Sequence, residues 1–333
     1  MRWGVVLVLA LPLAACRETV VFVQTPMDGG PGGATGFDGG PALCTGQPTG
    51  IEPEWPEIKM ALDRSTGMST ARVGNVSVLE AVRQALDETS MRYQKVVRFG
   101  YIEFPGASQP QVCNSCGDCV GNLIAPTSNL EAFSFSLNYC QTGVGQTCPE
   151  SESRPTASAL ARCSDTFWRP EQTRRYVLLV TNGQPDCGMG QISGCEVAKM
   201  LTRDLYNQLG VQTVVLAPGQ PDQYTMACLD DLAVFGGTRL RTAPMVNDLN
   251  NELEDVLRPI AMNACRLDLF SQIQNDSRAA VFWKGAQVPH NQDSGWDSDH
   301  NGSEIVLHGT WCTNLIAEGP AALEVIPDCN PRP

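Results

Sequence analysis

The residues of this chain best suited to chemistry are polar side chains at the ends of apolar segments. Three such segments stand out, at residues 62–68 (LDRSTGM), 155–157 (PTA) and 179–183 (LVTNG). The first and third end apolar runs typical of buried strands, and the second opens a short helix. Open parallel sheets bind ligands at their carboxyl edge, where the strands end, so we expect these segments to meet there and form a binding site.

The three segments resemble the metal-ion-dependent adhesion site of the von Willebrand factor A family. That family holds a divalent ion with an Asp-x-Ser-x-Ser loop after its first strand, a threonine from a later loop and an aspartate after a central strand. The resemblance covers roughly residues 51–262 and assigns Asp63 and Ser65 to the first loop, Thr156 to the second and Asn182 to the third. It implies a divalent cation (Mg²⁺, Ca²⁺ or Mn²⁺), which oxygen ligands suit, and a protein or peptide partner that supplies a further ligand.

Two residues depart from the family's metal-binding pattern. Gly67 stands where the second serine of the loop is expected, and Asn182 stands where the family has aspartate. Fewer anionic and hydroxyl ligands lower the affinity for a cation. A second interpretation needs no ion, because Asp63 and Ser65 can cap the following helix while Thr156 and Asn182 satisfy turns.

No combination of residues in the sequence indicates a catalytic centre. The three histidines, His290, His300 and His308, all lie near the C-terminus, and no serine or cysteine has a credible base beside it in the sequence. We therefore predict that the protein is not an enzyme.

Two further motifs resemble metal sites but have simpler interpretations. Cys113, Cys116 and Cys119 have spacing found in zinc and iron–sulfur sites, yet in an exported chain such cysteines favour disulfides. Residues 297–302 (DSDHNG) begin like a calcium loop, but its twelfth position is His308 rather than glutamate. We predict a hairpin turn there.

The N-terminus indicates export and a lipid anchor. Arg2, an apolar stretch at residues 4–15 and the LAAC sequence at 13–16 resemble the signal peptide and lipobox of bacterial lipoproteins. The apolar stretch is shorter than the roughly 20 residues that span a bilayer, so we expect cleavage after residue 15 and lipidation of Cys16. Residues 16–50 hold this cysteine and a Gly- and Pro-rich segment that predicts a flexible linker. The expected location is the cell envelope, in the outer membrane or at the cell surface.

Charge and cysteine content agree with export and exclude one class of function. The formal net charge is −13, so a partnership with nucleic acid, which requires basic surface, is excluded. The 14 cysteines suit disulfide formation outside the cytoplasm. Proximity in the sequence suggests the pairs Cys187–Cys195 and Cys312–Cys329, although sequence alone does not determine connectivity.

The segments that position these residues alternate between strand-like and helix-like patterns. Strands are expected at 58–62, 96–104, 175–181 and 211–217, and helices from about 75, from 155, and at 195–209, 224–235 and 245–260. Such alternation predicts an α/β fold, a doubly wound and mainly parallel sheet of the von Willebrand factor A or Rossmann kind. Residues 106–153 break the pattern and are rich in cysteine, which indicates a disulfide-rich insertion. After residue 262 short alternating runs predict a small all-β module at 263–333.

These features predict a cell-envelope lipoprotein whose A-like domain binds a protein or peptide partner, with a divalent cation at the contact. The alternative is a metal-free structural or assembly component of the envelope, in which the insertion makes the contacts.

Overall fold

The main sheet has six strands in the part of the chain that the structure describes, in the order β6-β5-β2-β7-β8-β9. This computed structural model describes residues 46–53, 55–105, 121–127, 131, 133–134, 152–164, 174–189, 191–299 and 301–329. The strands are β2 (Glu57–Asp63), β5 (Arg98–Phe104), β6 (Gly121–Thr127), β7 (Arg175–Val180), β8 (Val211–Pro218) and β9 (Arg241–Ala243). All neighbours run parallel except β5 and β6, which confirms the prediction of a mainly parallel α/β sheet.

Strand β2 lies at the centre of this sheet and is buried along its whole length. It pairs with β5 on one side and β7 on the other, and helices cover both faces, so its sequence is an almost continuous apolar run. The exception in the middle of the run is Lys59, whose ammonium donates to the carbonyl oxygen of Cys163 at 2.5 Å. The strand therefore fixes the position of Asp63, its last residue.

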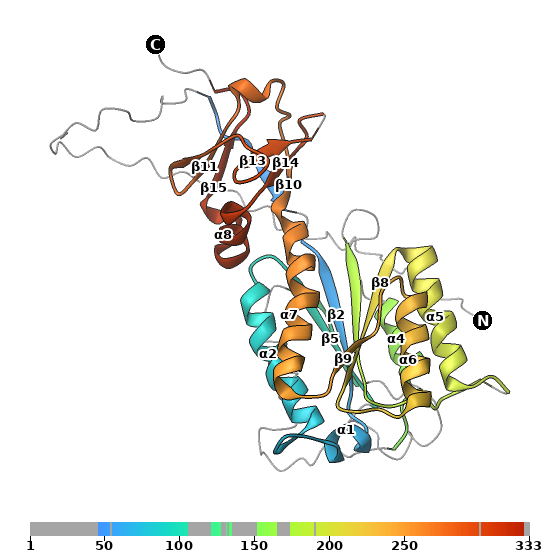
Figure 1. Ribbon diagram of the computed structural model, residues 1–333. Helices are drawn as coiled ribbons and strands as arrows, with labels where there is room; N and C mark the ends of the chain where they lie inside the picture. The colour runs from blue at the N-terminus through green and yellow to red at the C-terminus, as the bar shows by residue number, and fades with distance from the viewer. Residues whose placement is uncertain are drawn as a thin grey trace, which may run out of the picture. The chain divides into compact units, whose positions relative to one another are not determined.

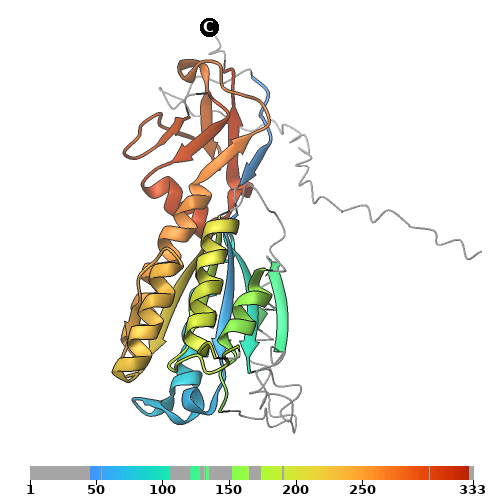
Figure 2. The ribbon, with the colours of Figure 1, turned by 90° about the vertical axis from the view of Figure 1, so that its right-hand side faces the viewer.

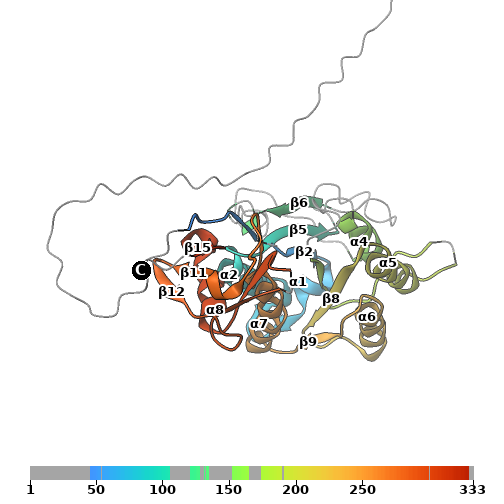
Figure 3. The same cartoon turned by 90° about the horizontal axis from the view of Figure 1, so that it is seen from above.

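Two layers of helices cover the sheet (Figure 3). Helices α2 and α7 lie on one face, and α4, α5 and α6 lie on the other. Their bounds are α2 (Val78–Tyr93), α4 (Thr156–Ser164), α5 (Gly194–Leu209), α6 (Gln223–Phe235) and α7 (Val246–Met262). Each layer buries an apolar stripe of its helices against one face of the sheet, which is the main source of stability for such a fold.

The helix ends follow from local sequence. The hydroxyl of Ser193 accepts a hydrogen bond from the backbone nitrogen of Glu196 at the start of α5, and Gly210 ends the helix with φ of 63°. Glycine adopts this left-handed conformation without steric cost, so the predicted stop at Gly210 is confirmed. Helix α2 begins later than predicted because β3 (Arg72–Val73) and β4 (Val76–Ser77) form a small hairpin before it.

The predicted insertion contributes one strand to the main sheet. Strand β6 pairs antiparallel with β5 and runs along the edge of the sheet (Figure 2). The sequence analysis missed this strand because its apolar stretch is short and interrupted by a proline. Cys113, Cys116 and Cys119 lie outside the described residues, so their predicted disulfides stay a prediction.

Both disulfide pairings suggested by sequence proximity were wrong. Cys195 bonds to Cys228, which joins α5 to the neighbouring helix α6, so it does not pair with Cys187. Cys312 bonds to Cys265, and therefore not to Cys329. In both cases the partner lies on an adjacent packed element, 33 and 47 residues away in the sequence, rather than in the same loop.

The C-terminal module contains two small antiparallel sheets, in the orders β1-β10-β14-β13 and β12-β11-β15. Its strands are β1 (Ile51–Pro53), β10 (Arg266–Leu269), β11 (Ala280–Trp283), β12 (Ala286–Val288), β13 (Trp296–Ser298), β14 (Glu304–Leu307) and β15 (Leu323–Ile326). It also contains helix α8 (Thr310–Glu318), so the expectation of an all-β module was wrong. Strand β1, assigned from the sequence to the A-like domain, pairs with β10 of this module instead.

The acidic motif that starts at Asp297 begins within β13 and ends before β14. β13 and β14 are antiparallel, with Trp296 opposite Leu307. The Asp299 carboxylate accepts hydrogen bonds from the backbone nitrogen and hydroxyl of Ser303, at 2.8 and 3.1 Å, and from the backbone nitrogen of Glu304 at 3.1 Å. The predicted hairpin turn is confirmed, and the turn itself satisfies this carboxylate.

Residues 1–45, which include the predicted signal peptide, Cys16 and most of the predicted linker, lie outside the described residues. Among the helices that the structure does describe, none is both long and apolar enough to cross a membrane.

Candidate functional site

The residues assigned from the sequence meet at the carboxyl edge of the main sheet. Asp63 ends β2, Ser65 precedes α1 (Thr66–Thr70), Thr156 opens α4 and Asn182 follows β7. Figure 1 shows α1 at the end of the sheet where β2 stops. The contacts described next join these four positions into one cluster.

Asp63 is the buried centre of the cluster, with no exposed surface. Its Oδ1 accepts a hydrogen bond from the backbone nitrogen of Ser65 at 2.8 Å, and its Oδ2 accepts one from the Thr181 hydroxyl at 2.6 Å. Burial raises the pKa of Asp63 above its ordinary value, because desolvation outweighs these hydrogen bonds and the nearby charge of Arg154. An ionised carboxylate at this buried position therefore requires a positively charged side chain close to it.

The positive partner is Arg154, a residue that the sequence analysis did not single out. Its Nε lies 3.5 Å from Asp63 Oδ2 and donates to Ser65 Oγ at 3.1 Å. Its backbone nitrogen donates to Asp186 Oδ1 at 2.7 Å, which ties the arginine to the loop after β7. The only signal in the sequence was its place directly before Pro155, inside a segment already assigned to the site.

Two glycines make room for the arginine side chain. A Cβ atom placed on Gly67 would lie 2.1 Å from Arg154 Nη2, and one on Gly183 would lie 2.0 Å from Nε and 2.2 Å from Cζ. Real Cβ atoms do not approach other heavy atoms this closely, so any side chain at either position displaces the guanidinium. The guanidinium thus lies in a narrow space between the backbones of Gly67 and Gly183, which we call the cradle.

The other two assigned residues contact the backbone of this cluster. Asn182 Nδ2 donates to the carbonyl oxygen of Gly67 at 3.1 Å, while Asn182 Oδ1 is buried and has no hydrogen-bond partner among the described residues. The backbone nitrogen of Thr156 donates to the carbonyl oxygen of Arg154 at 2.7 Å. The capping interpretation fails for Ser65, which precedes α1 but makes no side-chain cap bond and contacts Arg154 instead.

A second arginine near the site is committed elsewhere. Arg64, between Asp63 and Ser65, forms a buried ion pair with Glu103 of β5, with Nη1 and Oε1 2.8 Å apart. Its backbone nitrogen donates to the carbonyl oxygen of Phe104 at 2.7 Å. This ion pair holds the loop after β2 in place, and the carboxylate of Glu103 neutralises the charge of Arg64.

The cluster as it stands does not fit the divalent ion that the family resemblance implies. The family pattern provides two serine hydroxyls and a second carboxylate, and this chain has Gly67 and Asn182 at those positions. The guanidinium of Arg154 already contacts Asp63 and Ser65, the two expected ligands of the first loop.

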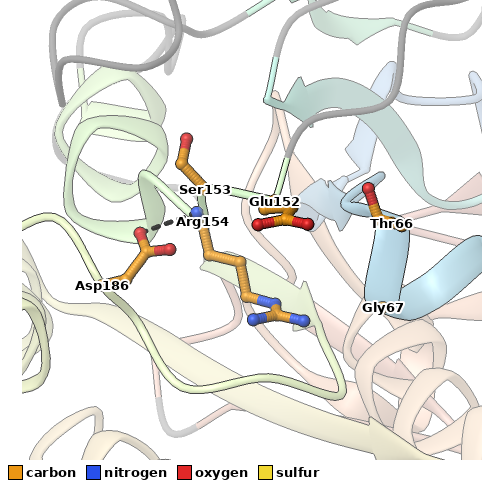
Figure 4. Close-up of a pocket in the computed structure, with 6 residues that line it drawn as sticks. All are labelled: Thr66, Gly67, Glu152, Ser153, Arg154 and Asp186. Carbon is orange, nitrogen blue, oxygen red and sulfur yellow. Dashed lines mark hydrogen bonds between the residues drawn. The ribbon is translucent and has the colours of Figure 1, made fainter.

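An open pocket of about 560 Å³ lies over this cluster. It is lined by Thr66, Gly67, Glu152, Ser153, Arg154 and Asp186. Figure 4 shows the Arg154 side chain extending between Asp186 and the start of α1 at Thr66 and Gly67, with the Glu152 carboxylate beside it. The side chain of Arg154 remains 23% exposed, so the guanidinium forms part of the pocket floor.

Exposed apolar side chains follow three neighbouring strands at this edge of the sheet. Met189 follows β7, Tyr224 follows β8 and Met245 follows β9, and their exposed fractions are 69%, 83% and 66%. Because the three strands run parallel, the loops after them lie at the same edge. Sequence reasoning missed these residues because nothing in the sequence distinguishes an exposed methionine from a buried one.

Comparison with known proteins gives weak similarities. No protein-family model and no curated protein matches the chain. Among solved structures, the conserved hypothetical protein BatB from Bacteroides thetaiotaomicron is 16% identical, with 62% of this chain and 98% of that chain covered and a TM-score of 0.47. The pilus adhesin SpaC from Lactobacillus rhamnosus GG is 12% identical, with 82% and 38% covered and a TM-score of 0.49. The PilB minor pilin from Streptococcus sanguinis is 13% identical, with 63% and 62% covered and a TM-score of 0.44. Values this low assign neither a family nor a ligand.

Proposed function

We propose that this chain is a cell-envelope binding or adhesion lipoprotein that engages a protein or peptide partner at the carboxyl edge of its parallel sheet. The observation that carries the proposal is the set of exposed apolar side chains at that edge, Met189, Tyr224 and Met245. Aromatic residues and methionine are enriched in protein–protein interfaces, so three large exposed apolar side chains that follow successive strands favour a contact surface at this edge.

The framework beneath these side chains supports binding. Each of the three residues lies in the segment that follows a different strand of one sheet, and such segments on a rigid scaffold commonly carry binding residues. The net charge of −13 agrees with a partner other than nucleic acid.

The anchor is tested by metabolic labelling of the bacterium that makes the protein with an alkyne-tagged fatty acid. The wild-type chain and Cys44→Ser are expected to carry the label, whereas Cys16→Ser loses it and is released from the membrane fraction. Cys44 is the matched control, because it lies in the same predicted linker. Labelling that persists in Cys16→Ser contradicts the lipid anchor.

The binding edge is tested by photocrosslinking in the same cells. A photoreactive amino acid replaces Tyr224 at the start of α6 or, as a control, Val234 near its end, both of which are exposed. We expect a discrete crosslinked adduct with one protein from position 224 and none from position 234. The yield of the adduct should fall at least about 10-fold in the double variant Met189→Ser, Met245→Ser. Equal adducts at both positions, or none at 224, favour the structural alternative over a specific binding edge.

A further inference from the structure

We propose that the guanidinium of Arg154 is a built-in cation that replaces the divalent ion at this site, so that the carboxyl edge is assembled without metal. The inference concerns the site itself and does not depend on which partner binds there. It explains together three features that the sequence left separate: the glycine at 67, the asparagine at 182 and the arginine at 154.

The first step of the argument is charge. Asp63 has no exposed surface, and a buried carboxylate is stable only beside a positive charge or several hydrogen-bond donors. Arg154 Nε lies 3.5 Å from Asp63 Oδ2, whereas the guanidinium of Arg64 forms an ion pair with Glu103. The charge that a metal ion would supply to Asp63 comes from the chain.

The second step is space. The cradle between Gly67 and Gly183 admits a guanidinium only because neither residue has a Cβ, which would lie 2.1 Å or less from Arg154 nitrogen atoms. The residue expected at position 67 in the family pattern is a serine that would both contact an ion and displace the arginine. Gly67 therefore removes an ion ligand and admits the replacement cation in one substitution.

The third step is the amide at position 182. Asn182 donates through Nδ2 to the carbonyl oxygen of Gly67, a bond that a carboxylate at this position has no proton to make. A carboxylate there would also add a negative charge beside Asp63, which one guanidinium does not balance. The asparagine therefore keeps the negative charge of the cluster at a level that one guanidinium balances.

The direct test measures metal binding by the full-length chain in detergent. Mn²⁺ titration followed by electron paramagnetic resonance is compared in wild type and Asp63→Ala, with melting temperatures in millimolar Mg²⁺, Ca²⁺ or Mn²⁺ against sodium chloride of equal ionic strength. We expect wild type to show no saturable site that depends on Asp63 and to melt within about 1 °C in all salts. One bound Mn²⁺ per chain that is lost in Asp63→Ala overturns the proposal.

A cycle of variants tests the cradle independently. Gly67→Ser is expected to lower the melting temperature by about 5 °C in wild type, because the new side chain displaces the guanidinium, but by less than about 2 °C in Arg154→Ala, where the space is free. Equal effects of Gly67→Ser in both backgrounds contradict a guanidinium in the cradle. Gly74→Ser is a control for a new serine away from Arg154, because the Cβ position of Gly74 has no neighbour within 4 Å. The strain of a serine at its φ of +63° should lower the melting temperature equally in both backgrounds.

The reverse experiment removes the arginine and introduces the ligands of the family pattern, so that a divalent ion can bind. The triple variant Arg154→Ala, Gly67→Ser, Asn182→Asp should bind one Mn²⁺ per chain and gain about 5 °C in melting temperature in saturating Mn²⁺, whereas wild type gains none. A triple variant that folds, by circular dichroism, and yet binds no more Mn²⁺ than wild type counts against the replacement. If the triple variant does not fold, the wild-type titration still decides the question.

Discussion

At the scale of single residues, the site depends on how the buried carboxylate of Asp63 is satisfied. Thr181→Val keeps the shape of the side chain but removes the hydroxyl, which donates to Asp63 Oδ2 at 2.6 Å and accepts from the backbone nitrogen of Gly183 at 3.2 Å. We expect the free energy of unfolding to fall by about 1.5–3 kcal/mol, the usual range for a hydrogen bond to a charged group. Urea denaturation followed by fluorescence measures this change in the free energy of unfolding.

The matched control is Thr213→Val in β8. Thr213 is equally buried, but its hydroxyl oxygen has no hydrogen-bond partner among the described residues, so valine should be neutral or stabilising by up to about 1 kcal/mol. If the two variants lose the same stability, the cost arises from repacking and not from the bond to Asp63.

The assigned polar residues of the site could be found from the sequence, and Arg154 could not. Asp63 and Asn182 directly follow apolar runs whose strand character is local, so their place at one edge follows from the parallel topology. Arg154 reaches Asp63 from a segment far away in the sequence, and nothing near it distinguishes its side chain from an ordinary exposed loop arginine. Its role depends on tertiary contact with Gly67 and Gly183.

At the scale of elements, the carboxylate of Asp299 holds the turn between β13 and β14 through hydrogen bonds from Ser303 and Glu304. Partial burial raises the pKa of this carboxyl, but hydrogen bonds from Glu304 and Ser303 outweigh the burial and hold the pKa below its ordinary value. A carboxyl whose pKa is lowered by folding stabilises the folded state at pH values above its unfolded-state pKa, which is about 4. This stabilisation is lost as the pH falls through the pKa of the folded state.

We therefore expect Asp299→Asn to destabilise the chain by about 1–2 kcal/mol near pH 7, with a difference from wild type that shrinks as pH falls below about 4. Urea denaturation between pH 7 and pH 3 measures the difference. Asp293→Asn, at an exposed position in the same module, is the control and should change stability little at any pH. A difference that is constant with pH is incompatible with a role for the ionised carboxylate.

The elements themselves were predictable wherever their pattern was local. The apolar runs of β2, β7 and β8 and the glycine after α5 indicated the alternating fold. Strand β6 was missed because it lies at the sheet edge and carries little apolar sequence, and α8 was missed because its short apolar stretch resembles a strand. The disulfides were missed because Cys195 and Cys228 meet through the packing of α5 against α6, which sequence distance does not report.

At the scale of the whole molecule, the C-terminal module is built from both ends of the described chain. Ile51–Pro53 of β1 pair with residues 267–269 of β10, and the backbone nitrogen of Phe270 donates to the carbonyl oxygen of Gly50 at 3.0 Å. The main sheet is therefore inserted between β1 and the rest of the module. No local pattern reveals such a pairing, because its two strands are separated in the sequence by the whole main sheet and its helices.

Removal of β1 tests this arrangement. A chain that begins at Trp55 lacks the strand, whereas a control chain that begins at Gly46 keeps it, and both lack the predicted lipid anchor. Without β1, the edge of β10 and the side chains of Leu267 and Leu269 lose their cover, so we expect amide hydrogen exchange at residues 266–269 and 304–307 to accelerate about 10-fold or more. Exchange in β2 and β7 should stay unchanged, because their ladders lie in the separate main sheet. Equal exchange of β10 in both chains would show that the module folds without its first strand, and faster exchange of β2 would show that the two parts unfold as one unit.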